Sequence, residues 1–363
     1  MGKDALMPSA PADVPFPLTA DDITASWLTA ALQESLPGVE VEGVEVLDQH
    51  SGTTGRLRLG LTTAPGTDAP ASVFVKLPPF DEGQRKLVAS TDMGRREARF
   101  YAGPGRETPF RIPASYVALA GDEPTEYVMV LEDLQAAGAR FANRLDPLAE
   151  EHGEQLAAGL ARVHAHFWED ARLEGEWSWI QPAMRGSYGA KLVASAREQF
   201  AADLPPVFAE LCDLFVEHHA RIAEIWDAGE RTLIHGDTHA GNQFGLDGQV
   251  GLYDWAVISR SPGIRDLAIY LGNSCPTELR RAEGDRWLGV YHQGLVDGGV
   301  DAPSLDLLRD RLRCCVLYAW IAATTTASMG SRWQPIEVGM LGMQRSTDAC
   351  ADLDTLGALR ERL

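Results

Sequence analysis

The chain has 363 residues, 45% of them hydrophobic and 23% charged, which is the composition of a globular protein with a well-developed core. Its 52 acidic residues outnumber its 32 basic ones and give a net charge of −20, which argues against nucleic acid as a partner because phosphate backbones require a basic surface. No run of 18 apolar residues and no apolar N-terminal stretch occur, so neither a membrane span nor a secretory signal is predicted.

Cysteine usage and charge suggest the compartment and the kind of substrate. Five cysteines occur without any CxxC spacing, which favours buried thiols over a disulfide framework or a zinc site. We therefore expect a cytoplasmic protein. An acidic surface attracts cationic substrates, although such surfaces also serve solubility alone.

The first 134 residues predict an arm followed by a β-rich domain. Four prolines make residues 1–18 a flexible N-terminal arm, and Thr19 is placed to cap a helix whose apolar stripe includes Ile23 and Trp27. Alternation of apolar and polar residues then predicts strands, with one helix among them. The predicted strands are 39–46, 56–61, 73–77, 116–119 and 127–131, and the helix lies around 95–101.

From residue 135 onward the pattern is mainly helical. Leu156, Leu160, Val163 and Phe167 share one face of a helix, and later helices are predicted over 278–296, 304–328 and 336–356. Residues 231–259 interrupt this pattern with short apolar runs separated by Gly, Asp, His and Asn. The chain therefore predicts two domains, 19–134 and 135–363, in an α+β organisation.

The segment HGDTHAGN at residues 235–242, followed by LYDW at 252–255, has the residues that phosphoryl transfer needs. A carboxylate must orient the attacking hydroxyl, and oxygen ligands must hold Mg²⁺ against nucleotide phosphates. Asp237 is the candidate base, and Asn242 and Asp254 are the candidate metal ligands. Asp, Asn and Gly also dominate ordinary turns, but the full spacing, with an apolar strand delivering Asp254, favours the functional interpretation.

A cation to match these acids is available in the β-rich part. Lys76 lies in an apolar strand, where a charge is costly unless it is paired, and Glu97 on the following helix is the predicted partner. A lysine facing solvent from a half-exposed strand is the alternative. Gly52, Thr53 and Thr54 lie between two predicted strands, where glycine allows close approach of phosphate to the backbone. A plain hairpin turn explains these three residues equally well, and no Walker A motif follows them.

Together these motifs resemble the aminoglycoside phosphotransferase and choline kinase superfamily, in particular its ecdysteroid-kinase-like branch. The matching pieces extend from Gly52 to Asp266 and are GTTG, VFVKL, REARFY, LEDL, LARVHAHFW, HGDTHAGN, LYDW and GIRDLA. The resemblance implies a protein-kinase-like fold of two lobes, with a small antiparallel β-rich N-lobe ending in a hinge and a larger, mainly α C-lobe.

The resemblance also implies ATP- and Mg²⁺-dependent phosphorylation of a hydroxyl on a small molecule. Lys76 paired with Glu97 would position the phosphates, with Asp237 as base and Mg²⁺ on Asn242 and Asp254. Asp266 would steady the catalytic loop. The adenine would meet backbone groups of the hinge, formed by Glu132, Asp133 and Leu134.

The acceptor and the alternative functions remain open at this point. Members of the superfamily act on antibiotics, choline, steroids, sugars and other alcohols. Three acids would favour a cationic acceptor unless they simply occupy an exposed loop, and four tryptophans would line an apolar pocket unless they pack in the core. The acids are Asp170, Glu174 and Glu176, and the tryptophans are Trp177, Trp179, Trp320 and Trp333.

The alternatives to a small-molecule kinase are a nucleotide-binding module without catalysis and a protein kinase. A nucleotide-binding module without catalysis is disfavoured by the complete set of candidate residues. A protein kinase is disfavoured by Gly236, where protein kinases carry Arg, and by the lack of an Ala-Pro-Glu segment after Asp254.

Overall fold

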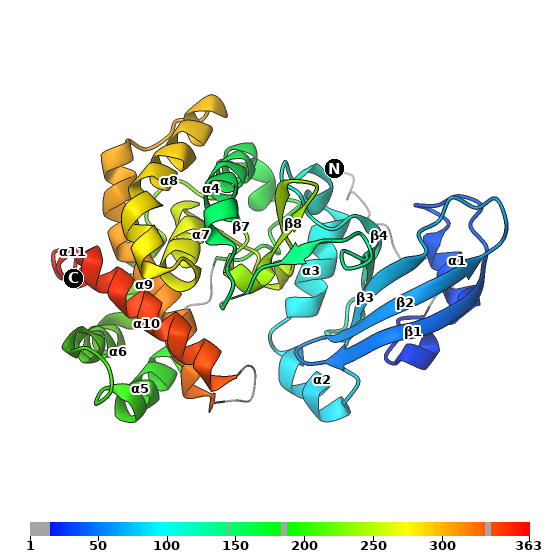
Figure 1. Ribbon diagram of the computed structural model, residues 1–363, viewed down its shortest axis with the longest axis horizontal. Helices are drawn as coiled ribbons and strands as arrows, with labels where there is room; N and C mark the ends of the chain where they lie inside the picture. The colour runs from blue at the N-terminus through cyan, green and yellow to red at the C-terminus, as the bar shows by residue number, and fades with distance from the viewer. Residues whose placement is uncertain (1–14, 144, 183–186, 331–334) are drawn as a thin grey trace. The chain divides into compact units, whose positions relative to one another are not determined.

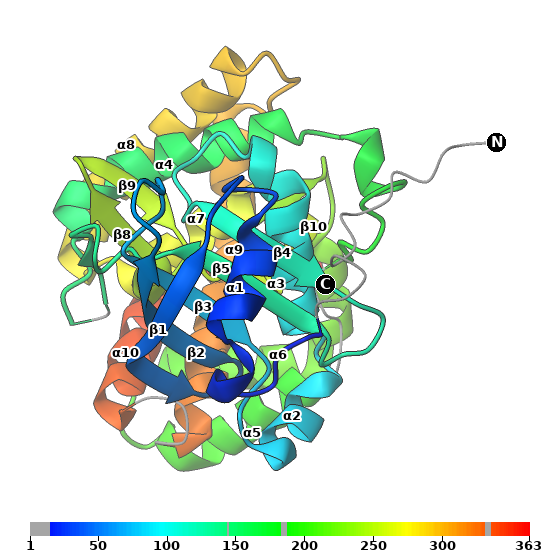
Figure 2. The same ribbon diagram turned by 90° about the vertical axis from the view of Figure 1, so that its right-hand side faces the viewer.

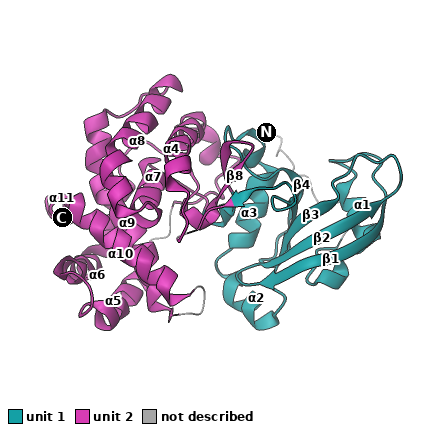
Figure 3. Cartoon of the chain, in the orientation of Figure 1, with its two compact units in different colours: residues 1–140, 253–257 teal, residues 141–252, 258–363 magenta. Residues whose placement is uncertain are grey.

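The computed structural model divides the chain into two units. The alternating apolar and polar residues of the first unit form a β-sheet. The structure describes residues 15–143, 145–182, 187–330 and 335–363, so most of the predicted N-terminal arm lies outside it. One unit comprises Met1–Arg140 and Tyr253–Val257, and the other comprises Phe141–Leu252 and Ile258–Leu363 (Figure 3).

The first unit contains a five-stranded antiparallel sheet in the order β1-β2-β3-β5-β4 (Figure 1). All five predicted strands are present. They are β1 (Val41–Ser51), β2 (Gly55–Thr63), β3 (Ser72–Leu77), β4 (Ser115–Ala120) and β5 (Tyr127–Glu132).

Odd-numbered residues of β2 and β3, such as Leu57 and Val75, pack with helix α1 (Ala25–Leu32) in a buried apolar core. Figure 2 shows α1 lying across this face of the sheet. Helix α3 (Met93–Ala102), the predicted helix, lies on the opposite face (Figure 1). Even-numbered residues of β2 and β3 therefore face α3.

The start of this unit differs from its prediction. Thr19 caps a 3₁₀ turn, Ala20–Asp22, and the α-helix begins only after Thr24, whose hydroxyl accepts a hydrogen bond from the Trp27 amide at 3.1 Å. The reason is Ile23, whose φ of −91° and ψ of 75° are not helical. Near the end of the predicted arm, the Trp27 indole donates a hydrogen bond to the Pro15 carbonyl at 3.0 Å.

Helix α2 (Glu82–Ala89) was not predicted. Asp81 caps it by accepting a hydrogen bond from the Gln84 amide at 2.8 Å. None of its side chains is buried, so it has no apolar stripe from which periodicity could identify it.

The second unit is mainly helical and contains two small sheets, β6-β8-β9 and β10-β7. The helices are α4 (Ala149–His166), α5 (Tyr188–Phe200), α6 (Pro206–Trp226), α7 (Ile264–Ile269), α8 (Thr277–Asp297), α9 (Leu305–Ser328), α10 (Ile336–Asp352) and α11 (Thr355–Arg360). The strands are β6 (Arg140–Phe141), β7 (Thr232–Ile234), β8 (Gln243–Leu246), β9 (Gln249–Leu252) and β10 (Ser259–Ser261). Strands β7, β8 and β9, with β10 beginning at Ser259, account for the non-helical pattern of residues 231–259.

All three predicted C-terminal helices are present as α8, α9 and α10, but the third ends earlier than predicted. The chain leaves α10 after Asp352, and a new helix begins at Thr355. Asp354 separates them because its φ of 48° is left-handed and its carboxylate accepts a hydrogen bond from the Gly357 amide at 3.2 Å, which caps α11.

The five cysteines are buried and unbonded, as predicted. Burial raises the pKa of the thiols of Cys212, Cys275, Cys315 and Cys350 to about 12. Within the described residues, no helix is long and apolar enough to cross a membrane.

Candidate active site

Lys76 lies near the end of β3, between two residues of the apolar core. Since Val75 and Leu77 point toward α1, the pleat directs Lys76 to the α3 face. There its ammonium forms an ion pair with Glu97 of α3 and lies 3.1 Å from Asp254 Oδ1. Lys76 is only 4% exposed, so the alternative of a solvent-facing lysine is wrong.

Glu97 has no exposed surface and shares the buried face of α3 with Phe100 and Tyr101. Burial raises the pKa of the Glu97 carboxyl, and Lys76 opposes that rise. The pKa of Tyr101 is raised as well, first by burial and then by the nearby charge of Glu97. The predicted pairing of Lys76 with Glu97 is thus present, and its role toward a nucleotide stays a prediction.

Asp254 follows β9 in sequence, yet residues 253–257 cluster with the first unit. The contact responsible is between Trp255 and Phe100 of α3, whose rings stack with centroids 4.2 Å apart and planes 11° apart. Asp254 has a left-handed φ of 63°, which a non-glycine residue adopts at a cost. In this conformation its carboxylate meets Lys76.

The predicted phosphate turn joins β1 to β2. The Gly52 amide donates to the Thr54 carbonyl at 3.0 Å, and Thr54 Oγ1 accepts a hydrogen bond from Arg56 Nε at 3.3 Å. Gly55 ends the turn in a tight position, because a Cβ there would lie 2.7 Å from the Pro78 carbonyl oxygen. The turn is therefore compact at its β2 end, with a glycine required on steric grounds.

Of the predicted hinge residues, Glu132 is the last residue of β5, and Asp133 and Leu134 follow it. The Glu132 carboxylate accepts two hydrogen bonds from Arg111, at 2.6 and 2.8 Å. Asp133 accepts hydrogen bonds from Arg58 and Ser72, which lower the pKa of its carboxyl although burial acts to raise it. Both acidic side chains thus have structural partners, which leaves any contact with adenine to the backbone.

In the second unit, β7 leads into the loop 235–242. Asn242 Nδ2 donates to the Asp237 carbonyl oxygen at 2.8 Å and lies 3.4 Å from Asp237 Oδ2. His239 Nε2 also lies 3.4 Å from that carboxylate oxygen. The side chain of Asp237 is 38% exposed, so it is accessible from solvent while its backbone is held by Asn242.

Asp266 lies in the first turn of α7 and anchors this loop. Its carboxylate accepts hydrogen bonds from the His235 amide at 2.7 Å and the Gly236 amide at 2.8 Å. Gly236 has a left-handed φ of 82°, which explains why this position carries glycine. His164 of α4 contacts Asp266 at 3.3 Å and the Tyr291 hydroxyl at 2.9 Å, so both of its ring nitrogens have partners.

The candidate metal ligands offer oxygen atoms, which Mg²⁺ prefers. Since Asn242 uses Nδ2 to donate to Asp237, its carbonyl oxygen is the atom suited to a cation. Mg²⁺ needs only one or two protein oxygens when water and phosphate complete its shell. Within the described part of the chain, no three His, Cys, Asp or Glu residues group as a metal site.

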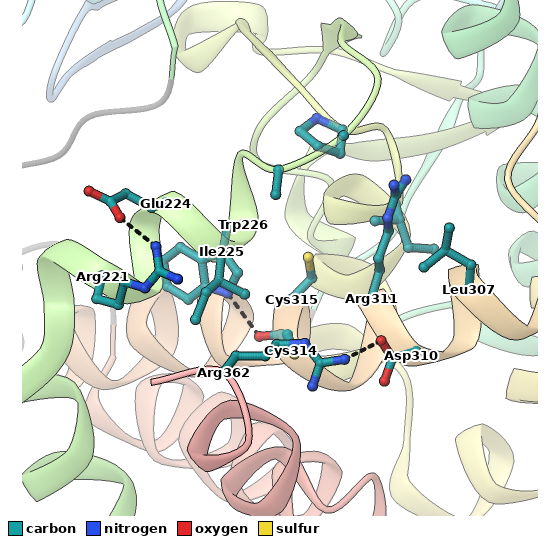
Figure 4. Close-up of a pocket in the computed structure, with 14 residues that line it drawn as sticks. Arg221, Glu224, Ile225, Trp226, Leu307, Asp310, Arg311, Cys314, Cys315 and Arg362 are labelled. Carbon is teal, nitrogen blue, oxygen red and sulfur yellow. Dashed lines mark hydrogen bonds and ion pairs between the residues drawn. The ribbon is translucent and has the colours of Figure 1, made fainter.

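A cavity of about 530 Å³ in the second unit lies between the end of α6 and the first half of α9 (Figure 4). Trp226, Cys314 and Cys315 are among its lining residues, and Arg221 pairs with Glu224 at 2.8 Å at its edge. None of the predicted site residues lines this cavity, and neither does any residue of the loop 235–242.

Two of the acidic residues considered for the acceptor have arginine partners, and two of the tryptophans are buried. Asp170 accepts hydrogen bonds from Arg172, and Glu174 lies 2.5 Å from Arg260. Trp177 and Trp320 are buried in the core, Trp179 is half-buried, and Trp333 lies outside the described residues. These observations support the structural interpretation of Asp170, Glu174, Trp177 and Trp320.

Arg56 is a residue of the site that the motifs did not identify. Its guanidinium lies 3.5 Å from Asp254 Oδ2. The alternation of β2 contained the signal, because Leu57 and Leu59 face the core and Arg56 must therefore share the face of Lys76.

The antiparallel sheet of the first unit and the mainly helical second unit define a protein-kinase-like α+β fold. Similar solved structures include an aminoglycoside 2'-phosphotransferase-IIIa in complex with GDP (TM-score 0.52, 14% identity, 90% of this chain and 99% of that one). They also include an ethanolamine kinase of Plasmodium vivax (TM-score 0.50, 14% identity, 88% of this chain and 83% of that one). No curated protein matches the chain.

Residues 48–299, more than half of the chain, match the ecdysteroid kinase-like family. The chain belongs to that family, and the resemblance predicted from its motifs is confirmed.

Proposed function

We propose that this protein transfers the γ-phosphate of ATP, with Mg²⁺, to a hydroxyl group of a small molecule. The observation that carries the proposal is the buried Lys76, held between Glu97 and Asp254. A buried ion pair costs desolvation energy and is weak support for stability alone. A lysine kept charged and oriented at such a cost is what a phosphate-binding site requires.

The first unit would bind the nucleotide. Lys76, oriented by Glu97, would contact the phosphates, and the turn Gly52, Thr53 and Thr54 would offer backbone amides to them. The adenine would meet backbone groups of Glu132–Leu134. The GDP complex of one similar structure motivates testing GTP beside ATP.

The second unit would supply the chemistry at the acceptor. Asp237 would accept the proton of the acceptor hydroxyl as its oxygen bonds to the γ-phosphorus, while the bond from that phosphorus to ADP breaks. Asn242 and Asp254 would hold Mg²⁺, which neutralises charge on the phosphates. His239, 3.4 Å from Asp237, is the neighbour placed to hold that carboxylate in position.

The acceptor would be a discrete alcohol, as the family name and the ethanolamine kinase among the similar structures suggest. Because Asp170 and Glu174 are engaged by arginines, they do not argue for a cationic acceptor. Amines, aminoglycosides, steroids and sugars should therefore be screened with equal weight.

The test is an ATP-consumption screen over those four classes, with product mass confirming one added phosphate. Asp237→Asn should lower kcat by roughly 10²–10⁴, the scale of general-base assistance, and leave nucleotide affinity nearly unchanged. Phosphorylation of proteins only, or of no acceptor, contradicts the proposal.

A thermal-shift experiment separates binding from chemistry. A non-hydrolysable ATP analogue with Mg²⁺ should raise the melting temperature of wild type and Asp237→Asn, but not of Asp254→Ala. Equal shifts in all three proteins would refute the metal-ligand role of Asp254. Full turnover by Asp237→Asn would refute the base.

A further inference from the structure

Two cations face each other across neighbouring strands of the first unit. Arg56 of β2 and Lys76 of β3 are directly paired in the antiparallel register. Their neighbours Leu57 and Val75 belong to the apolar core, so both charged side chains lie on the α3 face. Like charges placed directly opposite are destabilising, and something must offset their repulsion.

Asp254 offsets it by lying within reach of both cations. Its Oδ1 is 3.1 Å from Lys76 Nζ, and its Oδ2 is 3.5 Å from Arg56 Nη2. Arg56 is also tied to the predicted phosphate turn through Thr54 Oγ1 at 3.3 Å. The cluster contains two cations, Arg56 and Lys76, and two carboxylates, Glu97 and Asp254.

The two cations differ in freedom of movement. Lys76 has 5% of its side chain exposed and contacts both carboxylates, whereas Arg56 has 37% exposed and contacts only Asp254 among them. A half-exposed guanidinium on a flexible stem can change partners without uncovering a buried charge. Arg56 is therefore the mobile member of the cluster.

We propose that Arg56 is a second phosphate-binding cation, which leaves Asp254 and binds the phosphates of the nucleotide. This inference rests on the proposed function, in which Asp254 turns to Mg²⁺. Once Asp254 serves a metal, Arg56 and Lys76 face each other without an anion between them. A phosphate supplies that anion, and guanidinium binds phosphate through two parallel hydrogen bonds.

The experiment compares wild type with Arg56→Gln and Arg56→Lys by isothermal titration calorimetry. The ligands are adenosine, AMP, ADP and a non-hydrolysable ATP analogue, each with Mg²⁺. Arg56→Gln should weaken ADP and the ATP analogue by about 10- to 100-fold, the scale of charge-assisted hydrogen bonds, and leave adenosine unchanged. Arg56→Lys should recover part of the loss, because it keeps the charge without the planar fork.

Lys86→Gln is the matched control, because it removes a cation from the same unit at an exposed ion pair with Glu82. It should bind all four ligands as wild type does. An equal loss for all ligands in Arg56→Gln would mean a merely structural role and would overturn the inference. If Arg56→Gln binds all four ligands as wild type does, while wild type binds ligands with more phosphates more tightly, this inference is overturned and the proposed function is not.

Wild type that binds no nucleotide overturns both this inference and the proposed function. If Arg56→Gln does not fold, Arg56→Lys decides the question. If Arg56→Lys binds ADP as tightly as wild type does, the guanidinium fork does not recognise phosphate. If Arg56→Lys loses more affinity for each added phosphate, from AMP to the ATP analogue, the inference is supported.

Discussion

In the first unit, Lys76 is surrounded by carboxylates, whereas in the second unit the loop that carries Asp237 is held by hydrogen bonds. Lys76 contacts the carboxylates of Glu97 and Asp254. Asp237 lies in a loop whose backbone is held by Asn242 and by the carboxylate of Asp266. The first arrangement is a partly buried cluster of opposite charges, while the second supports one accessible carboxylate. The proposed nucleotide site and the proposed base have these different requirements.

Removing the anchor of the loop should have the largest effect on stability. Asp266→Ala would leave the buried amides of His235 and Gly236 without acceptors, at about 1–3 kcal/mol each. We expect the second unit to lose roughly 2–6 kcal/mol and turnover to be abolished. Urea denaturation and hydrogen exchange of these two amides measure the effect, and retained protection at both amides contradicts it.

Breaking the charge cluster should cost less. Lys76→Met leaves Glu97 buried without its cation, which should cost about 3 kcal/mol at pH 7, the low end for a buried pair, because Glu97 can take up a proton. Nucleotide binding should also weaken, since the phosphates lose a positioning charge. Urea denaturation at pH 5 and pH 7 tests this, because the loss should be smaller at pH 5. A loss that does not depend on pH would show that Glu97 is not the group left uncompensated.

The pH dependence of the first unit should follow Glu97. Burial raises the pKa of its carboxyl above the ordinary value of 4.5, so the folded state holds this proton more tightly than the unfolded state. The Glu97 contribution to stability should therefore fall as pH rises from about 4.5 through the raised pKa, by at most about 1.4 kcal/mol per pH unit. Glu97→Gln should remove this slope, and an identical pH profile in the variant argues against the assignment.

The smallest effect is expected at an exposed pair on the same unit. Lys86 and Glu82 lie 2.7 Å apart on α2, with most of each side chain in solvent. Lys86→Ala should change stability by less than about 0.5 kcal/mol, because exposed ion pairs contribute little. A loss as large as that of Lys76→Met would mean that burial does not distinguish the two lysines.

Strand alternation was enough to predict the sheet, and the α3 helix was predicted to supply Glu97 as the partner of Lys76. Helices α8 and α9 lie within one residue of their predicted bounds. Helix α8 buries one face, whereas α9 buries four successive residues, 314–317, and is therefore covered on most sides. Prediction failed where no face is buried, as in α2, and where a single backbone angle interrupts a regular pattern, as at Ile23 and Asp354. Such angles are chosen by local packing, which periodicity does not report.

The amino-acid sequence by itself determined the family, the five strands of the first unit, and the chemical nature of the candidate groups, because motif spacing and alternation are properties of the linear chain. Only the tertiary structure decided which groups meet. Asp254 joins Lys76 because the Trp255 ring stacks on Phe100 of α3, and Arg56 joins them because β2 pairs with β3 in one register. Both contacts link residues distant in the chain, and packing rather than local pattern selects them.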